Sequence, residues 1–134
     1  MITYDETMEI LSDIADEIPE EFYRELNGGI ILLPDSKTHP DSRPDDKLYV
    51  LGEYHNDRKG YGGLGRYIVI YHGSFVKMYP GIRRKYQTEK LREVLIHEFT
   101  HHMESLSGER ALQIKDARQL GKYISKSIDA DTDI

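Results

Sequence analysis

The run of residues 91–108 constrains the chain most, because it carries the pattern His-Glu-x-x-His between His97 and His101. On a helix, residues four positions apart lie one turn above each other on the same face. Two imidazoles placed in this way can both reach one metal ion, and Zn²⁺ accepts them at about 2.0–2.1 Å while leaving positions for a third ligand and a water molecule. Glu98 is turned by about 100° around the helix axis. There it can take a proton from the metal-bound water instead of binding the metal.

The surrounding sequence predicts that this run is a helix with two different faces. Thr88 is a candidate N-cap residue, and Gly108 is a candidate for the residue just beyond the C-terminus. One side of the helical wheel is largely apolar and carries Leu91, Leu95, Phe99, His102, Met103 and Leu106. The other side carries His97, His101 and Glu104.

This division of the helix favours a metal site on the polar face, rather than incidental surface histidines on an amphipathic helix. A purely structural helix with such incidental histidines would bind no metal at equilibrium. His102 receives the opposite interpretation. Because it lies on the apolar face, it is expected to be a hydrogen-bonded histidine of the core and not a ligand.

Length and charge narrow the class of protein. The chain has 134 residues, which suits one domain spanning 1–134. Its formal net charge is −6, which argues against a nucleic acid or an anionic membrane as partner. The absence of Cys excludes disulfides and zinc-thiolate sites. The N-terminus lacks the pattern of a signal peptide, and no apolar stretch is long enough to span a bilayer. A cytoplasmic protein is therefore expected.

Helices are expected at both ends of the chain. Thr3 and Glu6 have the spacing of a capping box, and apolar residues continue at helical spacing to Ile18. A second, turn-rich helix is expected at 19–26. The residues after Gly108 predict a last helix to about residue 127, before an acidic and frayed tail at 129–134.

The middle of the chain predicts a small sheet. Short apolar or β-branched runs between Gly- and Pro-rich segments indicate three strands, at 30–33, 48–54 and 67–71. Residues 34–47 contain three prolines and are expected to form a polar loop. The fold class is therefore α+β, with an antiparallel or mixed sheet and helices against one face.

Three strands followed by a His-Glu-x-x-His helix is the order of the minimal zincin core. More narrowly, the chain resembles the small bacterial zincin-like metallopeptidase family, from about residue 4 to about residue 110. The matching parts are the acidic N-terminal helix, Val50 to Tyr54, the Tyr61-Gly62-Gly63 turn, and Arg92 to His102 with its doubled histidine. The resemblance implies a zincin fold, one Zn²⁺ per chain and a peptidase activity.

One departure from the family pattern bears on the third zinc ligand. Relatives typically continue after the doubled histidine with an apolar residue, a Gly that ends the helix, and soon an Asp. Here residues 103–109 read Met-Glu-Ser-Leu-Ser-Gly-Glu. Glu109 follows the later Gly much as the family's acid does. Asp116 is an equal candidate, because a helical hairpin closed at the Gly would bring it beside residue 100. Glu104 is less favoured, since its Cα lies about 10 Å along the axis from that of His97.

The leading hypothesis is a zinc-dependent hydrolase, most simply a peptidase acting on a peptide or protein substrate. Glu98 would be the general base and would then deliver the proton to the leaving amine. The strand at 67–71, expected at the sheet edge, could bind an extended peptide by strand addition. Tyr67 and Tyr71 would either line that cleft or serve in packing. The alternative is a zincin-fold metal-binding or interaction module without significant turnover.

Overall fold

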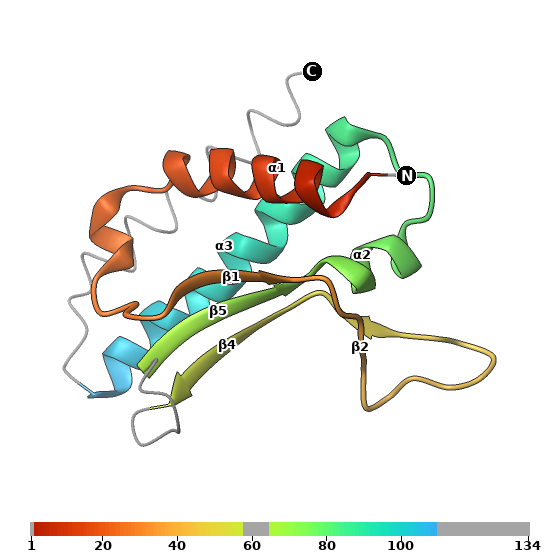
Figure 1. Cartoon of the computed structure of the whole chain (residues 1–134). Coiled ribbons are helices and arrows are strands. Elements are labelled where there is room, and N and C mark those ends of the chain that lie inside the picture. Colours follow the sequence, from red (N-terminus) through yellow and green to blue (C-terminus); the bar gives the residue numbers. More distant parts are fainter. Residues whose placement is uncertain (1, 58–64, 110–134) are drawn as a thin grey trace.

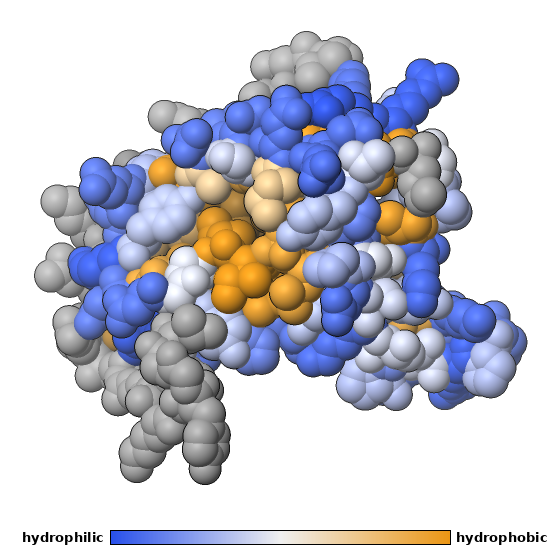
Figure 2. Space-filling model, viewed as in Figure 1, coloured by the Kyte–Doolittle hydropathy of each residue, from blue (hydrophilic) through white to orange (hydrophobic). Residues whose placement is uncertain are grey.

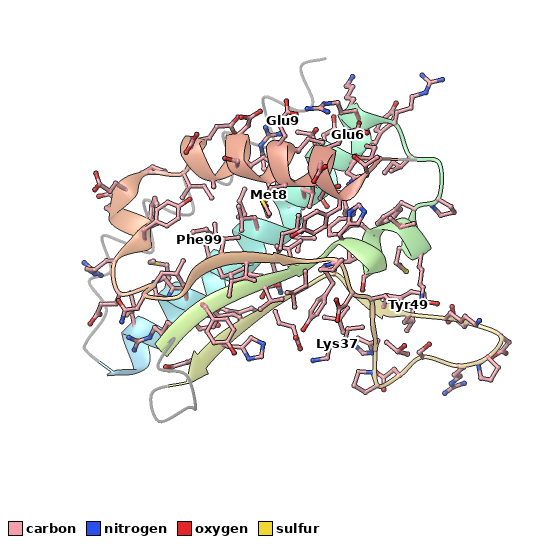
Figure 3. The ribbon with its side chains drawn as sticks, in the orientation of Figure 1. Glu6, Met8, Glu9, Lys37, Tyr49 and Phe99 are labelled. Atoms are coloured by element: carbon pink, nitrogen blue, oxygen red, sulfur yellow. The ribbon has the colours of Figure 1, made fainter. Side chains whose placement is uncertain are left out.

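Two long helices pack on one side of a small sheet in the computed structural model, which describes residues 2–57 and 65–109 (Figure 1). The fold is α+β, as the sequence predicts. The helices are α1 (Tyr4–Glu17), α2 (His72–Met78) and α3 (Arg84–Glu109). The main sheet contains β1 (Gly29–Leu33), β4 (Gly52–Asp57) and β5 (Gly65–Tyr71). The core lies between the sheet and the two longer helices, where Phe99 of α3 is fully buried (Figure 3).

The first helix begins as predicted. The backbone N–H of Glu6 donates to Thr3 Oγ1 at 3.1 Å, and the backbone N–H of Thr3 donates to Glu6 Oε1 at 3.4 Å. This capping box satisfies two backbone donors that the first turn of a helix otherwise leaves unpaired. The buried face of α1 then presents Ile10, Leu11 and Ile14 to the core.

The second expected helix, at 19–26, is wrong in kind and length. A short 3₁₀ helix spans only Glu20–Tyr23. Arg24 has the extended backbone angles φ −54° and ψ 126°, which end the helical path. Its carbonyl oxygen lies 2.8 Å from Nε2 of His102 instead of joining a helical ladder. Glu25 follows with a positive φ of 61°, so the backbone turns here and the helix ends before Leu26.

The main sheet is mixed and has the order β1-β5-β4. β1 pairs in parallel with β5, with Ile31 opposite Val69. β4 pairs antiparallel with β5, with Glu53 opposite the same Val69. The expectation that the strand at 67–71 lies at the sheet edge is therefore wrong, since β5 is central. Its Ile68 and Ile70 are fully buried, which fits a strand that is paired on both sides.

Residues 34–54 form more strand pairs than the sequence predicts, since a polar loop followed by one strand was expected. β2 (Lys37–Thr38) and β3 (Tyr49–Val50) form a separate antiparallel ladder, and Leu51 separates β3 from β4. Lys37 and Tyr49 mark this ladder in Figure 3. A Cβ atom on Gly52 would lie 2.8 Å from Val94 Cγ1, so glycine lets α3 approach the start of β4 closely.

The long helix α3 begins at Arg84, earlier than the expected N-cap at Thr88. Thr88 lies inside the helix, because its hydroxyl donates to the carbonyl oxygen of Arg84 at 2.8 Å. Gly108 does not follow the helix either, since α3 continues to Glu109. The apolar face is confirmed, with Leu91, Leu95, Phe99, Met103 and Leu106 all buried.

Several expectations fall outside the described residues. They are the Tyr61-Gly62-Gly63 turn, the last helix from 110 onward and the tail at 129–134. Within the described part, none of the helices is both long and apolar enough to cross a membrane. The surface viewed in Figure 2 gathers hydrophobic residues over β1, where Ile30, Ile31 and Leu33 are only half-buried.

Candidate functional site

His97 and His101 lie one turn apart on the exposed side of α3, and their side chains converge. The two Nε2 atoms are 3.1 Å apart, and the rings meet edge to face with centroids separated by 4.6 Å. Two nitrogens bound to one tetrahedral Zn²⁺ at about 2.0–2.1 Å would be about 3.3 Å apart. The pair therefore fits two neighbouring positions of one zinc ion, as the spacing in the sequence predicts.

Glu104 contacts His101 from the side opposite to His97. Its Oε2 lies 3.4 Å from Nδ1 of His101, whereas Nε2 is the nitrogen that faces His97. A carboxylate on the second ring nitrogen of a metal-binding histidine orients the ring and raises its basicity. At this position Glu104 can orient the ring of His101, and it is less well placed to bind the metal itself.

Glu98 lies between the two histidines along the helix, but its side chain is only 5% exposed. Burial raises the pKa of the Glu98 carboxyl, and the negative charge of Glu53 acts in the same direction. His97 and His101 oppose this shift when they are charged. A carboxyl group with a raised pKa is suited to accepting and then releasing a proton.

Two cavities meet at Glu98, which lines both of them. The first, called here the polar cavity, has a volume of about 590 Å³ and is lined by Glu53, Tyr54, Asn56, Glu98, His101, Glu104 and Ser105. The second, called here the β3–α3 cavity, has a volume of about 600 Å³ and lies between β3 and α3. It is lined by His39, Pro40, Tyr49, Val50, Leu51, Gly52, Lys90, Glu93, Val94, His97 and Glu98. The two candidate metal ligands thus line different cavities, His101 the first and His97 the second.

Glu53 on β4 is held ionised by a small network beside the polar cavity. Lys37 Nζ and the Tyr71 hydroxyl each donate to one of its carboxylate oxygens at 2.5 Å. Burial alone would raise the pKa of Glu53, but these hydrogen bonds outweigh burial and lower it. The pKa of Tyr71 is raised by burial and by the same carboxylate. Glu53 therefore keeps a fixed negative charge near Glu98.

Tyr67 and Tyr71, the two tyrosines for which the sequence leaves open a cleft or a packing role, line neither cavity. The ring of Tyr67 stacks on His55 with centroids 4.8 Å apart. The hydroxyl of Tyr71 is engaged with Glu53. Both tyrosines therefore serve the packing of the sheet in this structure.

His102 is the hydrogen-bonded core histidine that the sequence predicts. It is fully buried, with Nε2 2.8 Å from the carbonyl oxygen of Arg24 and Nδ1 2.8 Å from the Tyr54 hydroxyl. A carbonyl can only accept, so Nε2 carries the proton and Nδ1 accepts from Tyr54. Burial lowers the pKa of His102 and so favours this neutral form.

The third zinc ligand stays a prediction. Among the residues that the structure describes, no three His, Cys, Asp or Glu side chains lie close enough together to hold a metal ion. Glu109 ends α3, but its side chain is outside the described part of the chain, as is the whole of Asp116. His97 and His101 thus provide two fitting ligands, and the acid expected after the helix is not among the described groups.

Sequence reasoning did not assign a role to Glu53, Tyr54 or Asn56, although all three line the polar cavity. The available signal was the alternation of polar and aromatic residues along β4. In the structure this alternation places Tyr54 on the face of the strand toward α3 and Glu53 on the opposite face. Their proximity to Glu98 depends on the strand order, which a single sequence does not reveal.

Comparison with known proteins shows a similarity to a solved structure. No protein-family model and no curated protein matches the sequence. Among solved structures, the chain is similar to a conserved hypothetical protein from T. thermophilus, with 32% sequence identity and a TM-score of 0.67. The similarity covers 80% of this chain and 99% of the other. It therefore extends over nearly the whole of that protein.

Proposed function

The chain belongs to the same family as the conserved hypothetical protein from T. thermophilus, and we propose that it is a zinc-dependent hydrolase of peptide bonds with a small zincin-like fold. One observation carries this proposal. The Nε2 atoms of His97 and His101 converge at 3.1 Å, next to a buried glutamate that opens into two cavities. A pair of histidines with an adjacent carboxyl group is the arrangement that metal-assisted hydrolysis requires.

His97 and His101 would hold the zinc ion through their Nε2 atoms. Asp116 would complete the protein ligands. Glu104 and Glu109 are less favoured, because both lie on α3, about 10 Å and about 18 Å along the axis from His97. When bound, zinc supplies a Lewis acid that polarises the scissile carbonyl and lowers the pKa of a water molecule. The resemblance to zincin-like metallopeptidases in the motif region supports this choice of metal.

Glu98 would move the proton. Its carboxylate takes a proton from the attacking water and later gives that proton to the nitrogen of the leaving amine. The two cavities support this role, because Glu98 shares one of them with His101 and the other with His97, beside the place where the water would be held.

The edge strand β4 would bind the substrate, in place of the central strand β5. The backbone N–H of Tyr71 donates to the carbonyl oxygen of Leu51 at 2.9 Å, which directs the odd-numbered positions of this stretch toward β5. In an antiparallel pair the intervening residues direct their backbone groups the other way. Gly52 and Tyr54 therefore direct their N–H and C=O groups away from β5, to the side of β4 where, within the described sheet, an extended peptide can add as a further strand.

The rival proposal is a metal-binding or interaction module that uses the same fold without turnover. It is favoured by one observation, since only two described side chains converge as ligands. The two proposals differ in hydrolysis and not in metal binding.

Hydrolysis is tested with the zinc-loaded protein and a mixed peptide library, with products identified by mass spectrometry. We expect cleavage by the wild type and a loss of about 10²–10⁴-fold in Glu98→Gln, because the amide cannot accept the proton. Glu98→Gln should retain its zinc. Equal cleavage by both proteins would exclude Glu98 as the base, and loss of zinc from the variant would make Glu98 a ligand or a structural residue.

A further inference from the structure

One flank of α3, beside α1, has the burial of an interface that lies outside the core. Ile96 on this flank is only 6% exposed, yet it does not belong to the cluster of buried apolar side chains that forms the core of the described part. Its neighbours one turn away on the helix, Arg92 and Thr100, are only partly buried. An isoleucine in such surroundings is buried when a further apolar surface lies against it. The flank at Ile96 is therefore a docking surface for another element.

The part of α1 next to this flank is acidic. Residues 4–23 contain eight Asp or Glu residues and no Lys or Arg. Glu17 is paired with Arg92 of α3, whose guanidinium nitrogen lies 3.3 Å from the carboxylate. Asp13, one turn before Glu17, and Asp16 are exposed and have no ion-pair partner among the described residues. The flank thus combines an apolar position on α3 with uncompensated negative charge on α1.

The sequence after α3, which lies outside the described part of the chain, has the complementary pattern. Residues 110–127 contain five Lys or Arg residues and one Asp. At helical spacing the segment has an apolar side and a basic side next to it. The apolar side consists of Leu112, Leu120, Tyr123 and Ile124, and the basic side consists of Lys115, Arg118, Lys122 and Lys126. A helix with this pattern can face α3 with its apolar side and α1 with its basic side.

The segment is also long enough to reach the flank. α3 ends at Glu109, thirteen residues after Ile96, which corresponds to about 20 Å along the helix axis. Residues 110–127 would cover about 27 Å as a helix. Because the segment starts at the end of α3, a turn at its beginning lets it run back along α3 past Ile96.

We propose that residues 110–127 form a helix that docks on the flank shared by α1 and α3, with its apolar side against Ile96 and its basic side against the acidic residues of α1. The apolar contact removes hydrocarbon surface from water, and the opposite charges of the two partners fix the orientation. This inference goes beyond the proposed hydrolase function and does not depend on zinc. The rival occupant of the flank is a second copy of the chain.

The test measures how often the flank is uncovered. The chain contains no cysteine, so Ile96→Cys gives the full-length protein a single thiol in the proposed interface. Its reaction with a maleimide is followed by mass spectrometry on the metal-free protein, and the same reaction in urea gives the rate for an open chain. We expect slow labelling, which the added substitution Leu120→Asp accelerates by about tenfold or more, because one buried leucine contributes at least that factor to docking.

The matched control for Leu120→Asp is Ile114→Asp. It removes a side chain of the same size and adds the same charge to the same segment, but position 114 lies outside the apolar side of the helix. The labelling rate should therefore stay that of the single-cysteine protein.

A second pair of variants tests the charges. Asp13→Lys combined with Asp16→Lys should accelerate labelling of the same thiol, because it places positive charge opposite the basic side of the segment. The control combines Asp45→Lys with Asp46→Lys, which changes the net charge equally in the exposed connection between β2 and β3. This control should leave the rate unchanged. Circular dichroism shows that each variant is folded.

The outcomes decide between the occupants of the flank. Labelling of the folded single-cysteine protein at the rate found in urea would contradict the proposal. Equal effects of Leu120→Asp and Ile114→Asp, or of the two charge reversals, would also contradict it. Protection that decreases when the protein is diluted would assign the flank to a second copy of the chain instead.

Discussion

Tyr54 and His102 join the edge strand β4 to the buried face of α3 through a hydrogen bond of 2.8 Å between the tyrosine hydroxyl and Nδ1 of the imidazole. His102 is the immediate neighbour of His101 in the sequence. The bond therefore fixes the position of the proposed substrate strand relative to the proposed metal site. The second nitrogen of His102 extends the connection to the carbonyl oxygen of Arg24.

Tyr54→Phe should destabilise the protein, because it leaves a buried nitrogen of His102 without its donor. An unsatisfied buried acceptor costs about 1–3 kcal/mol in the free energy of unfolding. The matched control is Tyr67→Phe, which removes a hydroxyl from a ring that stacks on His55. Urea denaturation measures both variants. Equal destabilisation of the two would show that the Tyr54 hydroxyl has no special role.

The fold was predictable wherever neighbours in the sequence decide the structure. The capping box at Thr3, the strand at 30–33 and the apolar face of α3 follow from local spacing, and so does the core position of His102. The approach of His97 to His101 also follows from spacing, because both lie on one helix.

The remainder depends on contacts that are distant in the sequence. The central place of β5 is set by its pairing with both β1 and β4, and apolar content alone does not distinguish a central strand from an edge. The partner of the Arg24 carbonyl oxygen, just after the 3₁₀ helix ends at Tyr23, is His102, which lies far along the chain. The proximity of Glu53 to Glu98 depends on the same strand order.

His72 should make stability depend on pH. It is 8% exposed, its Nδ1 has no hydrogen-bond partner among the described residues, and burial lowers its pKa. The unfolded chain therefore binds the proton more readily than the native protein. Stability is full above the ordinary histidine pKa of 6.5 and decreases as the pH falls below it.

The variant His72→Phe keeps an aromatic ring against Tyr4, which the histidine contacts edge to face. It should lose less stability on acidification than the wild type, by at most about 1.4 kcal/mol one pH unit below the unfolded-state pKa. Denaturation at several pH values between about 7.5 and 5.5 measures this. Parallel pH profiles for the two proteins would exclude His72 as a source of the dependence.

Glu104→Gln should weaken zinc binding without abolishing it. The carboxylate lies 3.4 Å from Nδ1 of His101, and loss of such a supporting group lowers metal affinity by about 10–100-fold. Competition with a fluorescent zinc chelator measures the affinity. The control is Glu93→Gln, which removes a negative charge four residues before His97, where the glutamate pairs with Lys90. Complete loss of zinc from Glu104→Gln would identify Glu104 as a ligand.

Glu109→Ala and Asp116→Ala should differ in zinc affinity, because only one of these acids would complete the ligand set. Replacement of the true ligand should weaken zinc binding far more than the other substitution does. The helical signal in circular dichroism should stay intact in both variants. If Asp116 is the ligand, truncation of the chain before it should also abolish binding. No change in either variant, together with loss of zinc in Glu104→Ala, would exclude both Glu109 and Asp116 as the third ligand.

The central claim is that His97 and His101 together hold one zinc ion, and elemental analysis of the purified protein tests it most directly. The wild type should contain about one zinc per chain, as a single tetrahedral site requires. The double variant His97→Ala, His101→Ala should contain none above the buffer background, while its circular dichroism spectrum stays that of the wild type. Equal zinc content in the two proteins would contradict the account.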